Sequence, residues 1–486
     1  MFPAADWLPT LDDAVAPPAV LGAGALTSFA FQGDDHDALV ARIGDAESPA
    51  ARLYDTAIAC QLAFRRVEGL ALQDEALALS PLYRVRRQAA PDRPSDRPSG
   101  RLLRLLALMA PGDLMVNTPL EFITGAIDVR LDLLYLLPDR ALPRVIPDHD
   151  VAFFAVSEAD APALARLRRL FDAWPRPALN DPRFLPLLAR DALARSLANV
   201  PAICSPPTVA VTRAALAAQL DAGQPPATGY PCLIRPSGSH AGAGLMRAGT
   251  PAELAACLRR SFARDFYLTA YQEYAGPDGL YHKSRIAFID RRPFLCHMAS
   301  SQDWMVHYLN AGMTESADRR AAEAYAMANF DLGFARRHEA AFAALHDRLG
   351  FDYYAIDCAE THDGRLLVFE ADTAAIVHLM DPPNLFPYKP PQMRKVFAAF
   401  EAMLRRRAGR DDDHDSGGHD TAAHDTAAHD TAGHDTAAHD TAGHDTAGHD
   451  TAPWAPGAAL TPPVSSPART ARHDPPGPAA GRRSAA

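Results

Sequence analysis

The sequence predicts a protein of mixed α/β and α+β class with a disordered C-terminal tail, and three observations lead to this prediction. Residues 351–378 alternate as two strands around a turn signal at His362-Asp-Gly. Residues 101–175 contain apolar runs typical of buried strands, with helical patterns between them. From residue 406 onward the chain offers almost no large apolar side chain to a core.

Composition narrows the class of protein. A chain of 486 residues with 48% hydrophobic residues suits two or three domains with a substantial core. The formal charge of −11 argues against a general nucleic-acid binder. No basic secretory signal opens the chain, and no apolar run approaches the roughly 20 residues that cross a bilayer. We therefore expect no membrane partner. The six cysteines lie singly, without a zinc or disulfide pattern, which suits a reducing compartment, so we expect a cytoplasmic protein.

The chain divides into five expected parts. These are an N-terminal helical segment at 1–90, a linker at 91–100, a small α/β domain at 101–175, an α+β domain at 176–405 and a tail at 406–486.

The first part is expected to contain a helix pair over residues 51–79, where apolar side chains recur at helical spacing. Such a pair is either a degenerate solenoid repeat that binds a partner or a unit that packs onto the next domain. Packing is favoured, because one pair is too few for a stable array. The Pro-, Ser- and Asp-rich stretch 91–100 reads as a solvated linker.

The small α/β domain is expected to have strands at 102–109, 129–137 and 151–156 and a helix that ends near Phe171. Thr118-Pro-Leu-Glu121 matches a capping box, in which the threonine and glutamate side chains satisfy the first backbone N–H groups of a helix. Asn117 and Thr118 lie at a strand-to-helix turn, and capping alone would explain Thr118.

Three carboxylates in the predicted hairpin at 351–378 form the main candidate site. Glu370 and Asp372 are two apart on one strand and therefore share a face. The preceding strand folds back beside them, so Asp357 can join them. Facing carboxylates repel one another unless a cation neutralises them, and Mg²⁺ prefers oxygen ligands together with substrate phosphates. The alternative is an acidic hairpin on the surface. Cys358 alternates to the other face, where core packing is expected.

A glycine-rich segment lies upstream, at residues 232–247. It reads as an apolar strand, a loop with several glycines and a second apolar stretch, with Arg235 just before the loop. Glycines let backbone N–H groups approach a phosphate, and a basic residue adds charge. The loop is not the phosphate loop in which Gly-Lys-Ser/Thr opens a helix. A plain hairpin is the alternative.

Two cations follow on a predicted strand at 281–290. Lys283 and Arg285 are two apart and share a face. They are either a solvated basic face or a pair aimed at phosphate, for which arginine is well suited. Arg190 and Arg195 lie on a predicted helix further upstream, in the segment that begins at Asn180. They either reach phosphates or lie exposed.

The ordered set of these pieces resembles the ATP-grasp superfamily of carboxylate–amine ligases, which includes glutathione synthetase and D-alanine–D-alanine ligase. The resemblance covers roughly residues 176–400, so the part at 176–405 is expected to be the ATP-grasp domain. It implies a nucleotide between two α+β lobes, ATP and Mg²⁺ (or Mn²⁺) as cofactors, and a carboxylate that is activated as an acyl phosphate and captured by an amine.

The resemblance also assigns roles to residues. Arg285 and Lys283 would be the catalytic cations, and Asp357, Glu370 and Asp372 would bind the metal. The expected nucleotide-binding residues are Arg235, Ser237, Gly238, Ser239, His240, Gly242, Gln272, Glu273 and Tyr274. Two of these positions depart from the family. Arg235 stands where lysine is usual, and Asp372 stands where asparagine is usual, which leaves room for altered activity.

We therefore expect an ADP-forming ligase whose partners are small-molecule or peptide carboxylates and amines, and a homo-oligomer is left open. The alternatives are a kinase on the same fold, a degenerate nucleotide-binding regulatory module, and a scaffold built on the N-terminal helices. The stretch 294–313 is rich in aromatic and hydrogen-bonding side chains and either lines an acceptor pocket or packs into the core. His378 either faces the same cleft or caps a buried helix.

The tail repeats His-Asp-Thr-Ala-x from His419 to about Ala452. A period of five matches neither helix nor strand, so disorder is expected. Histidine and aspartate can bind Ni²⁺, Zn²⁺ or Cu²⁺, and weak metal binding is the alternative to a passive tail.

Overall fold

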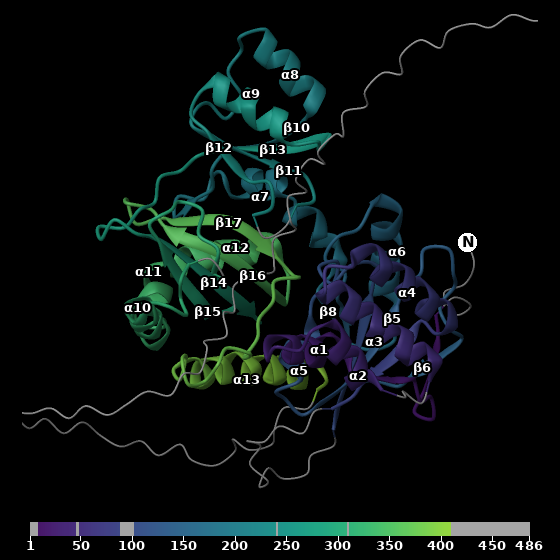
Figure 1. The fold of residues 1–486 in the computed structure, drawn as a ribbon. Helices are drawn as coiled ribbons and strands as arrows, with labels where there is room; N and C mark the ends of the chain where they lie inside the picture. The colour runs from purple at the N-terminus through teal and green to yellow at the C-terminus, as the bar shows by residue number, and fades with distance from the viewer. Residues whose placement is uncertain (1–7, 45–47, 88–101, 240–241, 309–310, 410–486) are drawn as a thin grey trace, which may run out of the picture. The chain divides into compact units, whose positions relative to one another are not determined.

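The computed structural model describes residues 8–44, 48–87, 102–239, 242–308 and 311–409. In these residues the chain forms four β-sheets and the helices that pack on them (Figure 1). The predicted linker, His240 and the tail beyond residue 409 lie outside the described residues. All six cysteines are free and buried. Among the described residues, no helix has the length and apolar character that a membrane crossing requires.

A six-stranded, mostly parallel sheet forms the first unit. Its strand order is β2-β3-β5-β4-β7-β8, and only the β3–β5 pair is antiparallel. The strands are β2 (Ala19–Val20), β3 (Leu82–Val85), β4 (Leu103–Met109), β5 (Val129–Tyr135), β7 (Val151–Phe154) and β8 (Ala178–Leu179). Its helices are α1 (Gly22–Phe31), α2 (His36–Ile43), α3 (Pro49–Leu62), α4 (Arg66–Leu79), α5 (Leu120–Thr124) and α6 (Ala161–Ala173). The three strands and the helix expected between residues 101 and 175 are confirmed to within about two residues.

The N-terminal part differs from the expected separate helical segment. The predicted helix pair is confirmed as α3 and α4, but β2 and β3 join the six-stranded sheet, and β1 (Thr10–Asp12) pairs with β6 (Val145–Pro147). The Tyr54 ring of α3 stacks on Tyr83 at 4.4 Å, and its hydroxyl lies 2.9 Å from that of Tyr135. The described residues 8–44 and 48–87 are therefore part of the α/β unit, and the helix pair packs on it as the sequence favoured.

The predicted capping box is wrong. Helix α5 begins at Leu120, its N-cap residue is Pro119, and no side chain caps it. The Glu121 carboxylate instead accepts a hydrogen bond from the Gly24 backbone N–H at 2.8 Å, and Asp55 accepts from the N–H groups of Leu21 and Gly22. A longer-range partner replaces the local one because the start of α1 also has N–H groups without a helical partner.

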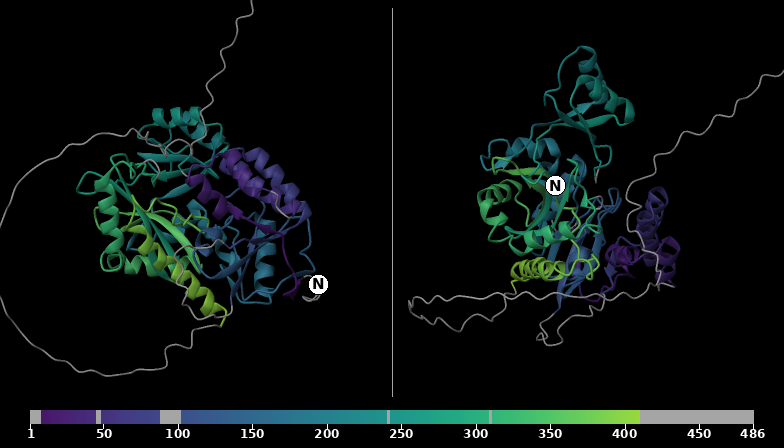
Figure 2. Two further views of the ribbon diagram at one scale, coloured as in Figure 1. Left: turned by 60° about the horizontal axis from the view of Figure 1, so that its bottom comes forward. Right: turned by 60° about the vertical axis from the view of Figure 1, so that its left-hand side comes forward.

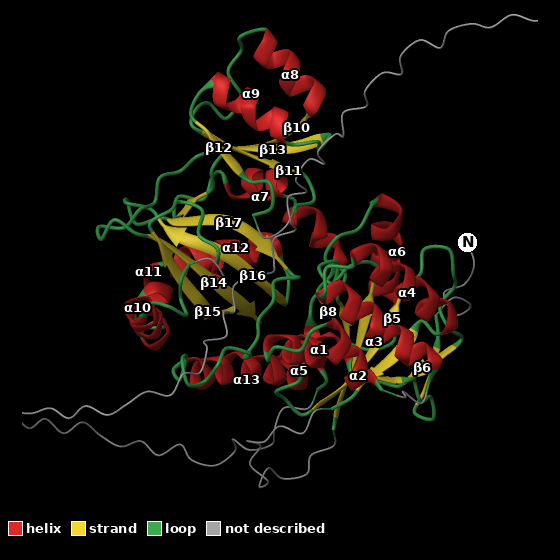
Figure 3. Cartoon of the chain, viewed as in Figure 1, coloured by secondary structure: helices red, strands yellow, loops and turns green. Residues whose placement is uncertain are grey.

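A four-stranded antiparallel sheet holds the glycine-rich segment. Its order is β10-β13-β11-β12, with β10 (Thr208–Thr212), β13 (Asp265–Ala270), β11 (Cys232–Pro236) and β12 (Met246–Ala248). Helices α8 (Arg213–Asp221) and α9 (Pro251–Arg260) pack together on one side of it (Figure 3). Their apolar side chains and those of the strands form a small core of their own. The predicted strand–loop–strand at 232–247 is confirmed.

A five-stranded sheet carries the acidic hairpin. Its order is β15-β14-β16-β17-β9, with β15 (Arg292–Ser301), β14 (Tyr281–Ile289), β16 (Tyr353–Glu360), β17 (Leu366–Asp372) and β9 (Ile203–Cys204). Around it are a 3₁₀ helix at Pro182–Leu188 and the helices α7 (Arg190–Leu197), α10 (Ala317–Ala328), α11 (Phe334–Arg337), α12 (Glu339–Leu349) and α13 (Lys389–Arg407). Figure 2 shows α13, in yellow-green, beside this sheet and its helices from two further directions.

Stability should depend on pH through Glu121. Burial raises the pKa of Glu121 to about 7 and that of Asp55 to about 6. A carboxyl whose pKa is higher in the folded state stabilises the fold at low pH, and this contribution is lost as pH rises from about 4.5 through 7. Glu121→Gln keeps an acceptor for Gly24 without a charge. We expect chemical denaturation to find it more stable than the wild type by roughly 1–3 kcal/mol at pH 8 and equal to it near pH 4.

The control for this prediction is Glu75→Gln on the exposed side of α4, which should change stability little at either pH. A Glu121→Gln protein that is less stable than the wild type at pH 8 would mean that the ionised carboxylate stabilises the start of α1.

Candidate active site

A row of charged residues crosses one face of the five-stranded sheet. In the strand register, Arg285 on β14 lies opposite Asp357 on β16, and Asp357 lies opposite Glu370 on β17. Lys283 precedes Arg285 by two residues and Asp372 follows Glu370 by two, so both share this face. The sequence prediction that each pair shares a face, and that the hairpin brings Asp357 beside Glu370, is confirmed.

Asp357 is the centre of this row. Its side chain is 4% exposed and accepts hydrogen bonds from Arg285 Nε at 2.8 Å and Nη2 at 3.1 Å. Lys283 Nζ lies 2.7 Å from the second carboxylate oxygen. Burial opposes ionisation, but the charges of Arg285 and Lys283 outweigh it and hold the pKa of Asp357 well below its usual range. Both predicted catalytic cations thus contact a predicted metal ligand.

Glu370 has a cation of its own. Arg190, the first residue of α7, donates from Nη2 to the Glu370 carboxylate and from Nη1 to the Phe369 carbonyl at 3.4 Å. Burial again opposes ionisation, and the Arg190 charge outweighs it, so the pKa of Glu370 is lowered. Arg190 therefore reaches the site, whereas Arg195 pairs with Asp191 on its own helix at 2.7 Å. An Asp372 oxygen accepts from the Ala374 N–H at 2.7 Å.

The three predicted metal ligands share a face but do not form a ready-made metal site. Among the described residues, no three His, Cys, Asp or Glu side chains converge closely enough to hold a metal ion. The oxygens of Asp357 and Glu370 are occupied by Lys283, Arg285 and Arg190. The donor chemistry fits Mg²⁺, since all the ligands are carboxylate oxygens, provided that these cations turn toward phosphate.

Arg235 is a buried cation beside the glycine-rich loop. It is 9% exposed and donates from Nε to Ser239 Oγ at 3.2 Å and from Nη2 to the Ser239 carbonyl. Burial and the nearby Arg190 lower its pKa to about 10, so it stays charged at neutral pH. No carboxylate in the described part of the chain forms an ion pair with it. A buried cation next to a second cation favours an anionic ligand.

The loop after Arg235 turns through glycines with positive φ, at 69° for Gly238 and 73° for Gly242. The Ser237 N–H is held by the Asp265 carbonyl at 3.0 Å, and Ser239 Oγ donates to the Pro236 carbonyl at 2.7 Å. The loop therefore starts from a fixed base on β11 and β13. The predicted contribution of His240 falls outside the described residues.

The predicted hinge, Gln272 to Tyr274, connects β13 of the four-stranded sheet to β14 of the five-stranded sheet. Gln272 Nε2 donates to the Glu273 carbonyl at 3.0 Å, and Glu273 Oε1 accepts from the N–H groups of Tyr274 and Ala275. Tyr274 is buried, with its hydroxyl 2.6 Å from the Trp304 carbonyl and its ring 5.2 Å from that of Phe369. Because Phe369 precedes Glu370, the hinge is packed against the strand that carries the acidic residues.

A second polar cluster adjoins the row. Its His297 and Tyr308 belong to the stretch 294–313 that the sequence indicated, whereas no local pattern pointed to Lys389, Asp381 or Glu323. Lys389 is 2% exposed and lies 3.1 Å from Asp381 and 3.5 Å from the fully buried Glu323, and it also bonds to the Tyr308 hydroxyl. The ring of His297 lies 4.6 Å from that of Tyr308.

The cluster reaches the charged row through His297, which is the register partner of Arg285. Burial and Arg285 hold the pKa of His297 well below its usual value, so it is neutral. Part of 294–313 thus packs in a small apolar core, and part faces the site. His378 is half-buried and its ring lies tilted against that of Phe31, with ring centroids 5.9 Å apart.

No protein-family model matches the chain, and no curated protein matches it. Several solved structures match the chain in their fold. The D-alanine–D-alanine ligase of Bacillus anthracis complexed with ATP is 12% identical, with a TM-score of 0.37 over 63% of this chain and 97% of that chain. A RimK domain ATP-grasp protein of Sphaerobacter thermophilus is 20% identical, with a TM-score of 0.33 over 63% and 98%. The VanG D-Ala:D-Ser ligase of Enterococcus faecalis is 14% identical, with a TM-score of 0.38 over 64% and 99%.

The Sphaerobacter thermophilus protein is an ATP-grasp protein, and ATP-grasp is the superfamily that the sequence resembles.

Removing the central charge should destabilise the site. Asp357→Asn leaves Lys283 and Arg285 facing an uncharged amide. We expect a loss of roughly 2–4 kcal/mol in the free energy of unfolding, less than for a fully buried pair because both cations are about one fifth exposed. Pyrophosphate should raise the melting temperature of this variant more than that of the wild type, because it restores negative charge. Thermal and chemical denaturation measure both effects.

The matched control is Asp363→Asn in the turn of the same hairpin, where the aspartate is exposed and pairs with Arg365. It should change stability little and gain nothing from pyrophosphate. An Asp357→Asn protein as stable as the wild type would show that the pair does not hold the sheet together.

Proposed function

We propose that this protein is an ATP-dependent carboxylate–amine ligase that forms ADP and works through an acyl phosphate. The observation that carries this proposal is the meeting of Arg235 and Arg190 beside Glu370, at one end of the row formed by Asp357, Arg285 and Lys283. Four cations face three carboxylates here, which leaves an excess of positive charge for a polyanion such as a nucleotide triphosphate.

The nucleotide would lie between the four-stranded and five-stranded sheets. Arg235 would contact its phosphates, with the N–H groups of Gly238 and Gly242 covering them. The hinge at Gln272 to Tyr274 would hold the base. Binding would also offset the burial and the Arg190 charge that lower the pKa of Arg235, since a phosphate gives that guanidinium an anionic partner.

Asp357, Glu370 and Asp372 would hold Mg²⁺ once Lys283, Arg285 and Arg190 turn toward the phosphates. A bound Mg²⁺ would neutralise charge on the transferring phosphoryl group.

In the reaction, an oxygen of the substrate carboxylate attacks the γ-phosphorus, and the bond from that phosphorus to the bridging oxygen breaks to release ADP. The amine nitrogen then attacks the acyl carbon, phosphate leaves and the nitrogen loses a proton. Arg285 and Lys283 would neutralise the acyl phosphate by positioned charge, and no side-chain nucleophile is needed.

A nucleotide-binding module without ligase activity is the second candidate. The close pairing of Asp357 with both Lys283 and Arg285 favours it, because these ion pairs must open before the residues can serve a reaction. Arg235 and Asp372, the two departures from the family pattern, point the same way. A kinase on this fold would form ADP without any dependence on an amine.

The nucleotide site can be tested by titration calorimetry with ATP, in the presence and absence of Mg²⁺. Arg235→Ala should raise the Kd at least about tenfold, since it removes charge-assisted hydrogen bonds. Arg235→Lys should retain most of the affinity, and Glu370→Gln should reduce the gain that Mg²⁺ provides. Arg259→Ala, on the exposed side of α9 in the same sheet unit, is the matched control and should bind as the wild type does. If the wild type does not bind millimolar ATP, the proposal fails.

The reaction itself can be tested by measuring ADP release with pooled carboxylates and amines, followed by mass spectrometry for new amides. We expect amine-dependent ADP formation that Arg285→Ala reduces about 100-fold. ADP release that does not require an amine would favour the kinase. Tight ATP binding without ADP release would favour the regulatory module.

A further inference from the structure

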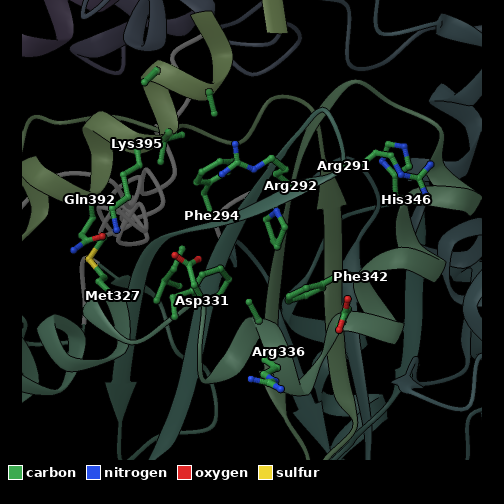
Figure 4. Close-up of a pocket in the computed structure, with 18 of the residues that line it drawn as sticks. Arg291, Arg292, Phe294, Met327, Asp331, Arg336, Phe342, His346, Gln392 and Lys395 are labelled. Atoms are coloured by element: carbon green, nitrogen blue, oxygen red, sulfur yellow. The ribbon is translucent and has the colours of Figure 1, made fainter. Parts of the chain in front are cut away.

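A cavity of about 910 Å³ lies at the outer edge of the five-stranded sheet, apart from the charged row. It is bounded by the Arg292 end of β15, by the segment from α10 to α12 and by α13 (Figure 4). β15 is the outermost strand of its sheet, with β14 as its only neighbour among the described strands. The floor is apolar and includes Phe294, Leu295, Met327, Phe330, Phe342 and Val396. We call this the β15 edge cavity.

Unpaired cations surround that apolar floor. Arg292, Arg336 and Lys395 are exposed and line the cavity from β15, α11 and α13, respectively. No carboxylate of the described residues forms an ion pair with any of the three. Figure 4 shows them on different sides of the hollow. Two carboxylates, Asp331 and Glu339, also line it, so the cations are in excess. This surface suits an acidic segment whose remaining side chains are small or apolar.

The chain itself contains such a segment directly after α13. Residues 411–440 contain no lysine or arginine, and threonine and alanine fill most of the positions between histidine and aspartate. The aspartates are Asp411, Asp412, Asp413, Asp415, Asp420, Asp425, Asp430, Asp435 and Asp440. Because α13 lines the cavity with Lys395, Val396 and Ala402 and ends at Arg407, the segment starts within a few residues of it. This connection gives the segment a high effective concentration at the cavity.

We propose that the acidic segment 411–440 docks in the β15 edge cavity of its own chain, with its aspartates on Arg292, Arg336 and Lys395 and its small side chains over the apolar floor. The charge complementarity and the direct connection through α13 favour this occupant over a second copy. The proposal does not depend on the proposed ligase activity.

The lysines make this proposal directly testable in the full chain. Lys283, Lys389 and Lys395 are the only lysines in the sequence, and the first two are paired inside the protein. A carbodiimide joins an amine to a neighbouring carboxylate without a spacer. We expect amide links between Lys395 and aspartates of 411–440, identified by mass spectrometry after digestion and reduced severalfold in 0.5 M NaCl by screening.

Two further measurements separate the possible outcomes. In a mixture of ¹⁵N-labelled and unlabelled chains, links within one chain support the proposal, and links between chains overturn it in favour of a second copy. Hydrogen exchange should show peptides from 291–295 and 392–402 better protected in the wild type than in a full chain whose aspartates at 411–440 are replaced by asparagine. Equal protection, or the absence of links from Lys395, overturns the proposal.

Matched variants of the cavity complete the test. Lys395→Arg keeps the charge but cannot form the amide, so the link should vanish while the protection remains. The pair Arg292→Glu and Arg336→Glu should lose both the link and the protection. Arg259→Glu, an equal charge reversal on the exposed side of α9, should lose neither. If the charge reversals at the cavity leave both signals unchanged, the segment docks elsewhere and the proposal fails.

Discussion

The burial of one carboxylate, Asp357, is the constraint on which the candidate site depends. An ionised carboxylate in the middle of a sheet is costly unless cations pair with it. β14 supplies two of them, Lys283 and Arg285, two positions apart on the face that meets Asp357. That pairing requires one register between β14 and β16. Because β17 continues the same sheet, Glu370 then lies directly beside Asp357.

Further charged residues, beyond Asp357 and its two cations, come from α7 and from the four-stranded sheet. Arg190 neutralises Glu370 from α7, while Arg235 reaches the same region from β11 without a carboxylate of its own. The site therefore consists of positive groups from separate elements, held near one another by a smaller number of negative ones. Such an arrangement is well suited to a ligand with several negative charges, since the ligand would complete the ion pairing that the side chains leave incomplete.

The N-terminal unit also depends on buried carboxylates with partners far away in the sequence. Asp55 and Glu121 accept backbone N–H groups at the start of α1, and burial raises the pKa of both carboxyls. These contacts join residues separated by 34 and 97 positions. They tie the first helix to the six-stranded sheet, as do the tyrosines that stack between α3 and β3. Residues 8–44 and 48–87 therefore belong to the fold of this unit.

The sequence by itself determined the elements whose signal is local. The alternation at 351–378, the apolar run of β4 and the helical spacing at 51–79 each report on the burial of their own residues, and the strands and helices that they predict all form. The faces shared by Lys283 with Arg285 and by Glu370 with Asp372 also follow from the period of a strand. The short strands β1 and β2 have only three and two residues, too few for any period to be read.

Only the tertiary structure decided which groups meet. Glu121 carries a capping signal, yet its carboxylate accepts from the Gly24 N–H at the start of α1, and no side chain caps its own helix. Arg190 and Glu370 are 180 residues apart, and Lys389 is buried among Asp381, Glu323 and Tyr308. A residue's neighbours in sequence carry no information about such partners. The long-range packing of sheets and helices selects them, and with them the charge balance of the site.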